Sequence, residues 1–501
     1  MIESIYSKVI LSKNEIPIPQ LKNGKTIDSR YNPQREAEAF ISNINSKDEY
    51  SYFILLGIGA GLILKELIKK FPACRIIAVE NTEEDINFLK QINSVKEMSN
   101  NSHIFMTSID KLSKTICNTY LPAKYGKPQL IKNGAWINEN QDKLSFIEKE
   151  INYALRIISA DYSVQAHFGK IWMHNILGNL KLLSNISNNK NVTNELNINT
   201  KKIAVVIAAG PSLEKHIKNL IKDRDSYFII STDTANKTLA RNKCIADLVI
   251  SIDGQAVSTN HFSGSIYKNT LYFFDICSNN SAASYTYSNG GKLIFFTSGH
   301  PLGSIASKAS KNPLPYIYSG SGTVTITALD LACKLGFKNI KILGADFAYS
   351  DGKAYTKGTY LETLYSLQEN KLITSEKIYD KLMFRTKLIE KDNRRKTTEI
   401  LEAYKKSFLE YISLNDINCC FENDVYSLKL RKETTKINIC QDFSIIKFFN
   451  YFLTCNEEEK EIALLPYIAY LKNKSITDKK FDDLLKLAQS FIVSYNKNYE
   501  K

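Results

Sequence analysis

Several features that mark whole classes of proteins are absent from this chain of 501 residues. Its nine cysteines are odd in number, irregularly spaced and without a Cys-x-x-Cys pair, which argues against a zinc site and a disulfide framework. No run of about 18 apolar residues without charge occurs, and Glu3, Lys8 and Lys13 interrupt the first apolar pieces. We therefore expect a cytoplasmic protein with no signal peptide and no membrane span.

Familiar catalytic signatures are also missing. The sequence has no His-Glu-x-x-His and no Gly-x-Ser-x-Gly, and its six histidines form no metal-ligand spacing. The only Asp-x-Asp, at 223–225, precedes a predicted strand and so lies at the edge of the sheet opposite the ligand side. We therefore expect no bound metal and no resident cofactor.

The composition is that of an ordinary globular protein of about three domains. Hydrophobic residues make up 44% of the chain, aromatic residues 11% and charged residues 24%, enough to build packed cores. The formal net charge is +14, but no RNA-binding aromatic signature, zinc finger or basic heptad accompanies it. An anionic, nucleotide-activated substrate is therefore expected, and a nucleic acid is not.

Hydrophobic patterning predicts an α/β protein in four parts. These are an N-terminal Rossmann-like domain at 1–140, a helical connector with an Asn-rich linker at 141–200, a central domain at 201–360 and a C-terminal helical domain at 361–501. In the central part, strand patterns alternate with helical ones, which predicts a doubly wound, mostly parallel sheet.

The N-terminal domain contains one glycine-rich turn, Gly57–Gly61, between a predicted strand and a helix, and Glu80 closes the next strand. Such glycines allow a ligand to approach the backbone, and the acid could hold a ribose hydroxyl, as in a dinucleotide or S-adenosylmethionine site. A tight turn alone also needs glycine. The sequence leaves both interpretations open, but we expect the catalytic site elsewhere.

Polar residues follow successive predicted strands of the central domain. Gly210, Pro211 and Ser212 turn the chain into a helix, and we expect free N–H groups there to face a phosphate. Thr232 and Asp233 end the second strand, at the sheet edge where α/β proteins bind ligands.

Further polar residues fall on the later strand ends and on one flexible loop. Asp253 follows the third strand, and Asp346 follows the last one, with Tyr349 and Tyr355 shortly after it. The loop at 319–323 brings glycines and hydroxyls to a helix start, which suits a phosphate or a sugar.

Taken together, these motifs resemble the central domain of the Maf (motility-associated factor) flagellin glycosyltransferases, and they are similar to bacterial CMP-sialic-acid-dependent sialyltransferases. The segments that carry the resemblance are Ala208–Leu213, Thr232–Ala235, Ser251–Gln255, Gly320–Thr325 and Leu343–Phe347. The resemblance implies transfer of a nonulosonic acid, of the pseudaminic or legionaminic type, from its CMP donor to Ser or Thr hydroxyls of flagellin, in the service of motility. Flagellin and the CMP-activated sugar would then be the partners.

The resemblance also implies roles for single residues. Those expected to hold the donor are Gly210, Pro211, Ser212, Thr232, Asp233, Ser321, Gly322, Thr323 and, if one residue is inserted, Tyr349. Tyr355 would contact the phosphate. The sialyltransferases place a histidine base after this tyrosine pair, whereas no histidine follows His300 here. The base is left open among Asp253, Asp346, Asp233 and His300.

Two alternatives remain at this point. The Gly-Pro-Ser turn is also similar to that of the archaeal 6-hydroxymethylpterin pyrophosphokinase MptE, which would imply ATP-dependent pyrophosphate transfer. A non-catalytic flagellin-binding protein with a decayed nucleotide site is the other possibility, although the intact set of polar strand ends argues against it.

Overall fold

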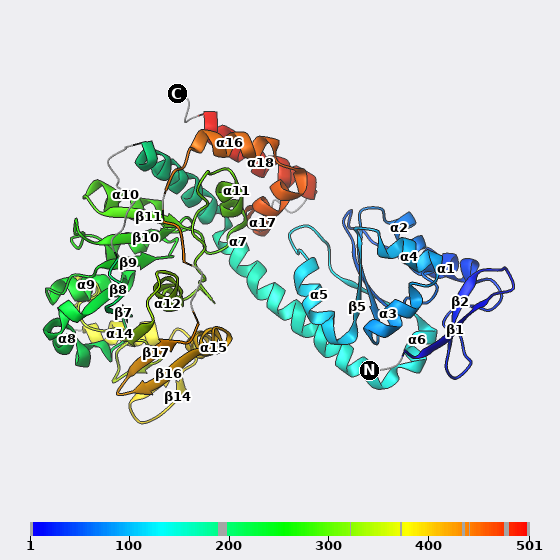
Figure 1. Ribbon diagram of the computed structural model, residues 1–501, viewed down its shortest axis with the longest axis horizontal. Helices are drawn as coiled ribbons and strands as arrows, with labels where there is room; N and C mark the ends of the chain where they lie inside the picture. Colours follow the sequence, from blue (N-terminus) through cyan, green and yellow to red (C-terminus); the bar gives the residue numbers. More distant parts are fainter. Residues whose placement is uncertain are drawn as a thin grey trace. The chain divides into compact units, whose positions relative to one another are not determined.

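The structure is a computed structural model that describes residues 4–188, 198–320, 322–370, 373–432, 436–439, 441–474 and 480–497, apart from the side chains of Ser375, Glu376 and Lys497. The chain forms two compact units, Met1–Gly169 with Leu465–Ala488, and Lys170–Leu464 with Gln489–Lys501. The first boundary between the units falls within one long helix, α7 (Leu144–Asn188) (Figure 1), and the other two fall within α17 (Glu457–Asn473) and α18 (Phe481–Lys497). This division differs from the four predicted parts.

The first unit is built on a four-stranded parallel sheet in the order β5-β4-β3-β6. Every residue of β3 is buried, so both faces of this strand must be covered by helices. Figure 1 shows α2 and α4 on one face and α5 on the other. The predicted Rossmann-like unit is therefore confirmed, with a β1–β2 hairpin added to it.

The elements of this unit have the following bounds: β1 (Tyr6–Leu11), β2 (Pro17–Leu21), α1 (Pro33–Ser42), β3 (Tyr52–Leu56), α2 (Leu62–Lys70), β4 (Arg75–Glu80), α3 (Glu83–Leu89), α4 (Asn93–Ser99), β5 (Ile104–Ser108), α5 (Leu112–Thr119), β6 (Gln129–Lys132) and α6 (Gly134–Glu139).

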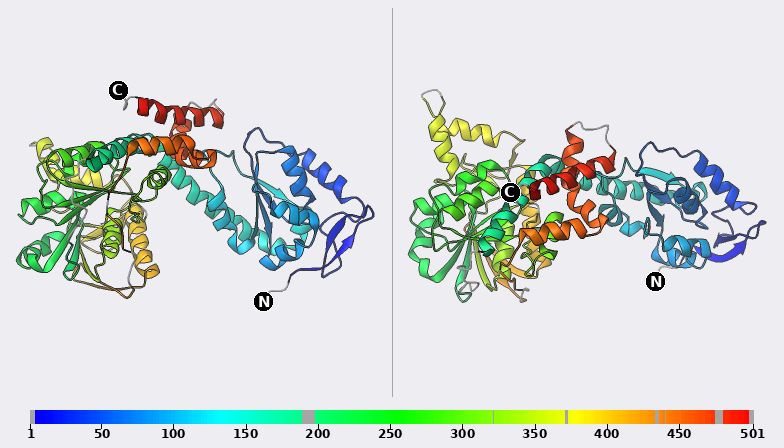
Figure 2. Two further views of the ribbon diagram at one scale, coloured as in Figure 1. Left: turned by 45° about the horizontal axis from the view of Figure 1, so that its top comes forward. Right: turned by 90° about the horizontal axis from the view of Figure 1, so that it is seen from above.

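The second unit is built on an eight-stranded sheet in the order β11-β10-β9-β8-β7-β12-β17-β16. Strands β7 to β12 run parallel, and the chain winds outward from β7 on one side and through β12 on the other. Helices cover both faces (Figure 2). The predicted doubly wound sheet is confirmed, and its switch point lies between β7 and β12, where such sheets open toward ligands.

The bounds in this unit, up to its last parallel strand, are β7 (Ile203–Ile207), α8 (Leu213–Lys222), β8 (Tyr227–Thr232), α9 (Asp233–Arg241), β9 (Leu248–Ser251), η4 (Ala256–His261), β10 (Leu271–Asp275), α10 (Asn280–Ser288), β11 (Lys292–Phe296), α11 (Pro301–Lys308), α12 (Val324–Lys334) and β12 (Asn339–Leu343). Helix α12 is buried from Thr325 to Cys333, because it packs against the middle of the sheet.

Beyond residue 361 the chain is mostly helical, as predicted, but the near absence of strands predicted there is wrong. Strands β16 and β17 form a hairpin that continues the central sheet, with β17 antiparallel to β12. A small sheet of β13, β15 and β14 lies near the switch point. Five of the six residues of β16 are exposed, so this strand has no apolar run that would reveal it.

The remaining bounds are β13 (Tyr349–Ser350), α13 (Tyr360–Gln368), α14 (Ser375–Met383), β14 (Ile389–Glu390), β15 (Arg395–Thr397), α15 (Glu399–Leu414), β16 (Ile417–Glu422), β17 (Val425–Leu430), α16 (Ile445–Thr454), α17 (Glu457–Asn473) and α18 (Phe481–Lys497).

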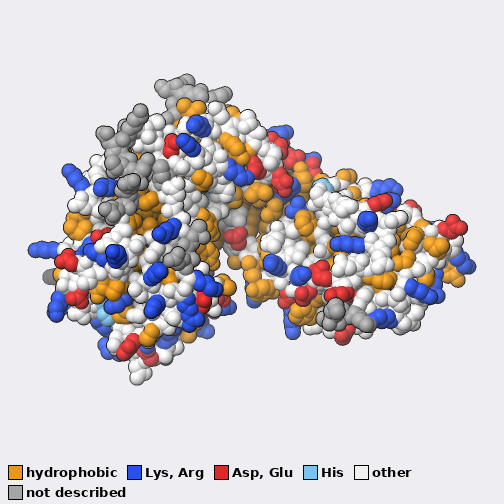
Figure 3. Space-filling model, viewed as in Figure 1, with side chains coloured by type: hydrophobic (Ala, Val, Ile, Leu, Met, Phe, Trp, Pro, Cys, Tyr) orange, Lys and Arg blue, Asp and Glu red, His pale blue; other side chains and the backbone are white. Residues whose placement is uncertain are grey.

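Two further observations concern the apolarity of the helices and the charge of the surface. None of the described helices combines the length and the apolarity that crossing a bilayer requires. On the face drawn in Figure 3, basic and acidic side chains are interspersed rather than gathered into one basic patch. The positive net charge is therefore spread over this face of the molecule.

Candidate functional site

The glycine turn of the first unit is occupied by the chain's own carboxylates. The N–H of Ile58 donates to Oε1 of Glu80 at 2.7 Å, and the N–H of Ala60 donates to Oδ2 of Asp28 at 2.9 Å. A Cβ added at Gly57 would overlap the side chain of Trp136, whose indole N–H donates to Glu80 at 2.7 Å. Two amides of the turn that could have faced a phosphate are thus already used.

Burial of these two carboxyl groups has an electrostatic consequence. Glu80 is fully buried and Asp28 is 8% exposed. Burial raises the pKa of each to about 7, against the opposing effect of the backbone N–H groups that donate to them.

The Gly-Pro-Ser turn of the second unit is also tied to an acid. The N–H of Ser212 donates to Oδ2 of Asp346 at 2.9 Å, and the hydroxyl of Ser212 donates to the other oxygen. The N–H of Gly210 donates to the carbonyl of Gly344 at 2.8 Å. The prediction that the N–H groups of this turn are free for a phosphate is therefore wrong for Gly210 and Ser212, and Ser212 does not cap α8.

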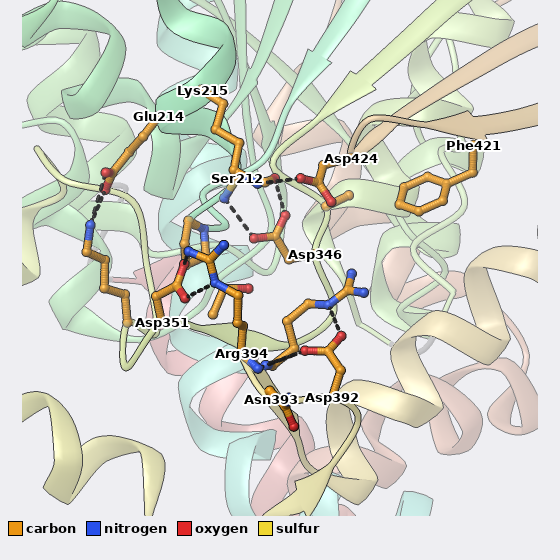
Figure 4. Close-up of a pocket in the computed structure, with 15 residues that line it drawn as sticks. Ser212, Glu214, Lys215, Asp346, Asp351, Asp392, Asn393, Arg394, Phe421 and Asp424 are labelled. Carbon is orange, nitrogen blue, oxygen red and sulfur yellow. Dashed lines mark hydrogen bonds and ion pairs between the residues drawn. The ribbon is translucent and has the colours of Figure 1, made fainter.

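Two cavities lie beside the strand ends of the central sheet. The first, which we call the Ser212 cavity, measures about 620 Å³ and is drawn in Figure 4. It is lined by Pro211, Ser212, Glu214, Lys215, Ala345, Asp346, Ser350, Asp351, Lys353, Asp392, Asn393, Arg394, Arg395, Phe421 and Asp424.

The second, which we call the Asp253 cavity, measures about 630 Å³. Its walls come from the ends of β8 and β9, from η4 and from α13 and α14. It is lined by Thr234, Asp253, Gln255, Val257, His261, Tyr355, Tyr360, Leu361, Leu364, Tyr365, Gln368, Ile378, Lys381, Leu382 and Arg385. The predicted residues Asp253 and Tyr355 therefore share one cavity, whereas Ser212 and Asp346 line the other.

Asp253 is held in place by its loop. Its Oδ1 accepts the N–H of Gln255 at 2.9 Å, and its carbonyl accepts the N–H of Asn279 at 2.9 Å. The buried amide of Asn175, on α7, donates to the carbonyls of Gly254 at 2.9 Å and Cys277 at 3.0 Å. Burial is the main cause that raises the pKa of Asp253, and nearby charges add to or oppose it.

His261 lines this cavity, although no sequence motif selects it. It ends η4, and its ring meets the ring of Tyr360 edge-on at 4.6 Å. Its charge interaction with Asp253 lowers the pKa of that carboxyl, against the larger effect of burial. Nδ1 of His261 is buried without a hydrogen-bond partner in the described structure. His261 comes close to Asp253 because η4 folds back over the end of β9. No local sequence motif indicates this interaction.

Phenols and cations also line the wall of this cavity. Burial raises the pKa of Tyr355 to about 12, and the neighbouring tyrosines 349, 360 and 365 act in the same direction. Tyr355 therefore stays protonated near neutral pH and can donate a hydrogen bond. Lys381 and Arg385 add positive charge at this wall. The positive charge of Arg385 lowers the pKa of Tyr349, against a larger effect of burial.

Several hydroxyls next to the lining residues lack partners. Oγ of Ser258 and Oγ1 of Thr232, Thr356 and Thr359 are buried without a hydrogen bond in the part of the chain that the structure describes. Buried polar groups usually have a partner, so each such atom calls for an explanation. Their neighbours in sequence, Val257, Tyr355 and Tyr360 among them, line the Asp253 cavity.

Two other predicted site residues, Asp233 and His300, line neither cavity. Asp233 is buried, and its carboxylate accepts the N–H of Thr234 at 2.6 Å and the hydroxyl of Ser251 at 2.7 Å, so it joins two strand ends. Nδ1 of His300 accepts the N–H of Leu302 at 3.2 Å and caps α11, and burial lowers the pKa of His300 to about 4. His300 lines neither cavity.

The described residues of the glycine- and hydroxyl-rich loop before α12 are not among those that line either cavity. Gly322 and Thr323 line neither cavity, and Thr323 precedes α12 without capping it through its side chain. Ser321 lies outside the described residues. Within the described ranges, no group of three or more His, Cys, Asp or Glu side chains is arranged to hold a metal ion.

Comparisons with known proteins address the central region. Residues 174–352 match the family described as 6-hydroxymethylpterin diphosphokinase MptE-like, so the resemblance to this family predicted from the motifs is confirmed there. A solved structure, that of MAf glycosyltransferase from Magnetospirillum magneticum AMB-1, aligns over 99% of this chain and 93% of its own, with 11% identity and a TM-score of 0.47. At that TM-score the likeness carries no argument about fold or activity.

Two relatives come from Treponema pallidum (strain Nichols), and both are described as uncharacterized. One is 30% identical over 230 residues, which is 45% of this chain and 76% of the relative. The other is 37% identical over 150 residues, which is 29% of this chain and 67% of the relative. The chain therefore belongs to the same family as these two Treponema proteins.

Proposed function

We propose that this protein is a glycosyltransferase that works in the cytoplasm and transfers a nonulosonic acid, of the pseudaminic or legionaminic type, from its CMP donor to Ser or Thr hydroxyls of flagellin. One observation carries the proposal: the Asp253 cavity is lined by a carboxylate, an imidazole, phenols and cations. The motif resemblance to the Maf proteins supports the identity of donor and acceptor.

The donor phosphate is assigned to the phenol and the cations that line the Asp253 cavity. In the transfer, the bond between the anomeric carbon and the phosphate oxygen breaks, and its electron pair leaves with CMP. The phenol of Tyr355 donates to the departing phosphate, while Lys381 and Arg385 offset its growing negative charge. The raised pKa of Tyr355 keeps this proton in place.

The acceptor hydroxyl is assigned to the imidazole and the carboxylate of the cavity. Its oxygen attacks the anomeric carbon, and its proton passes to the imidazole of His261. Nδ1 is buried, so Nε2 is the ring nitrogen that receives the proton. The carboxylate of Asp253 then stabilises the imidazolium by charge attraction, as its existing interaction with His261 indicates.

The decisive experiment measures transfer from CMP-activated pseudaminic and legionaminic acid to purified flagellin. We expect transfer to continue in excess EDTA, because the proposed groups neutralise the phosphate without a metal. Tyr355→Phe should lower turnover about 10²- to 10³-fold. Tyr153→Phe, a half-exposed tyrosine of α7 outside both cavities, is the matched control. Unchanged turnover in Tyr355→Phe would contradict the proposed role.

A second candidate function follows from the family match over residues 174–352, namely diphosphate transfer from ATP to a hydroxymethyl group. Such a reaction needs Mg²⁺ to neutralise the triphosphate. Thermal stabilisation by ATP with Mg²⁺, but not by CMP, would favour this alternative. A ligand at 100 times its Kd adds about 2.7 kcal/mol, which a melting experiment detects.

A further inference from the structure

The proposed transfer uses only the Asp253 cavity and leaves the Ser212 cavity without a role. Two features of the Ser212 cavity bear on what it could bind. Among the described residues that line it, four side chains are cationic and five are carboxylates, which is a nearly balanced charge, and one exposed aromatic ring is also present. It is comparable in volume to the Asp253 cavity and falls in the usual range for ligand pockets.

Every cation of the Ser212 cavity has a carboxylate partner from the same wall. The pairs are Lys215 with Asp424 at 2.7 Å, Lys353 with Glu214 at 3.0 Å, Arg394 with Asp351 at 2.8 Å and Arg395 with Asp392 at 2.7 Å. Figure 4 shows these pairs arranged around Ser212 and Asp346. A ligand of high net charge would have to break one of them, whereas an uncharged ligand would not.

The same residues supply hydrogen-bonding atoms to the wall of the cavity. Arg394 contacts Asp351 through Nε and Nη2, at 2.8 and 3.2 Å, and its guanidinium carries five N–H donors in all. Asn393 and Ser350 add uncharged donors and acceptors to the wall. Hydroxyl groups both donate and accept, so a molecule with many hydroxyls can match such a mixed set.

Phe421 supplies an apolar surface among these charges. Its side chain is 52% exposed. The centre of its ring lies 4.4 Å from the centre of the Tyr426 ring, and the two rings are tilted against each other. It comes from β16, beside Asp424 (Figure 4). An exposed ring next to paired polar groups suits a ligand with one apolar C–H face and a polar rim.

We propose that the Ser212 cavity is a second binding site, which takes a ring of an uncharged carbohydrate. The sugar packs its C–H face on Phe421, and its hydroxyls bond to the paired side chains. The site goes beyond the proposed transfer and does not depend on it, because none of its residues takes part in that reaction.

Saturation-transfer NMR on the full chain tests this site with glucose, galactose, N-acetylglucosamine and N-acetylgalactosamine in the millimolar range, and with inorganic phosphate and CMP as charged probes. We expect at least one neutral sugar to bind. Phe421→Ala should weaken it about tenfold, which corresponds to the loss of one ring contact. Phe146→Ala, a similarly exposed phenylalanine at 49%, should leave sugar binding unchanged.

Two further variants separate the outcomes. Asp253→Asn should leave sugar binding intact, and if it abolishes transfer at the same time, the two sites are independent. Asp351→Asn removes the partner of Arg394, so we expect weaker sugar binding and new binding of phosphate. If none of the four sugars binds, or if Phe421→Ala binds them as well as the unmodified protein does, the proposed carbohydrate site is wrong.

Discussion

The two glycine turns of this chain, Gly57–Gly61 and Gly210–Ser212, occupy the same kind of position between a strand and a helix, but their surroundings differ. Each leads from a buried strand toward a helix, and in each a backbone N–H is bound by a carboxylate of the same chain. In the first unit those carboxylates are buried, and Trp136 packs on the turn. In the second unit, Asp346 lines a cavity, and the neighbouring strand ends line another.

This comparison teaches how far a glycine turn can be trusted as a sign of function. Glycine records only that the backbone needs an unusual conformation or a close approach, and all three glycines of the first turn have positive φ. The better sign of a ligand site is a set of polar atoms with no partner inside the protein. In the second unit such atoms occur next to the residues that line the Asp253 cavity, and in the first unit both amide atoms of Asn81, the residue after Glu80, are buried without a partner.

The largest effect that would sharpen the comparison is expected at His261. His261→Ala should lower turnover by about 10² to 10⁴, because it removes the proposed proton acceptor. The pH dependence of the remaining activity should also change, which a merely structural role would not cause. His167→Ala, an exposed histidine of α7, serves as the control. Full activity in a folded His261→Ala protein would show that His261 is not the base.

A change in the first turn should affect stability rather than donor binding. Gly57→Ala places a methyl group against Trp136 at a φ of 90°, and should lower the free energy of unfolding of that unit by about 2–4 kcal/mol. Gly134→Ala, with open space around its Cβ, is the matched control. Trp136 fluorescence in a Trp172→Phe background follows this unit alone, since the chain has two tryptophans. Loss of CMP binding in a folded Gly57→Ala protein would contradict the comparison.

The buried acids of the first turn should also make that unit sensitive to pH. Glu80 and Asp28 have pKa values raised to about 7, so the folded unit holds protons that the unfolded chain releases at lower pH. Its free energy of unfolding should therefore fall as pH rises from about 4.5 to about 7, by at most about 1.4 kcal/mol per pH unit for each group. Denaturation of the Trp172→Phe protein at several pH values measures this slope. Glu80→Gln should reduce it, and an unchanged slope would show that Glu80 does not titrate in this range.

The smallest effect is expected from a pair of asparagines on α7. Asn175 donates to the carbonyls of Gly254 and Cys277, and Asn179, one turn later, donates to those of Ile276 and Ser278. Replacing either by Ala should cost about 1–3 kcal/mol of stability, since buried carbonyls lose their donors. Only Asn175→Ala should also lower turnover, by about tenfold, because it alone holds the loop of Asp253. Equal turnover in the two variants would exclude this positioning role.

Sequence patterns were enough to predict both parallel sheets. The residues predicted as one site are divided between two cavities, with Asp253 and Tyr355 in one and Ser212 and Asp346 in the other. Strand ends in parallel sheets meet at one edge, so residues at those ends can be brought together by topology alone. The carboxylate partners of the two turns could not be predicted, because Asp28 and Asp346 reach them from distant parts of the chain. Neither could the cavity contacts of His261 and Arg385.

The β16–β17 hairpin was missed for a different reason. Its turn residues, Asn423 and Asp424, both have positive φ, at 52° and 61°, which is the conformation of a tight hairpin turn. That dipeptide was the available signal. The dipeptide is a weak signal here, because the strand before it is almost entirely exposed and lacks an alternation of apolar and polar residues. The sequence around the hairpin has mostly helical spacing.

The position of this hairpin bears on how the central region can be cut from the rest of the chain. The region that matches the MptE-like family ends at residue 352, whereas the strand that pairs with β12 begins at Val425. A fragment that stops at 352 would leave the outer side of β12 with unpaired backbone groups, an open template for joining other chains edge to edge. We expect such a fragment to self-associate, and one extended through Leu430 to resist aggregation better.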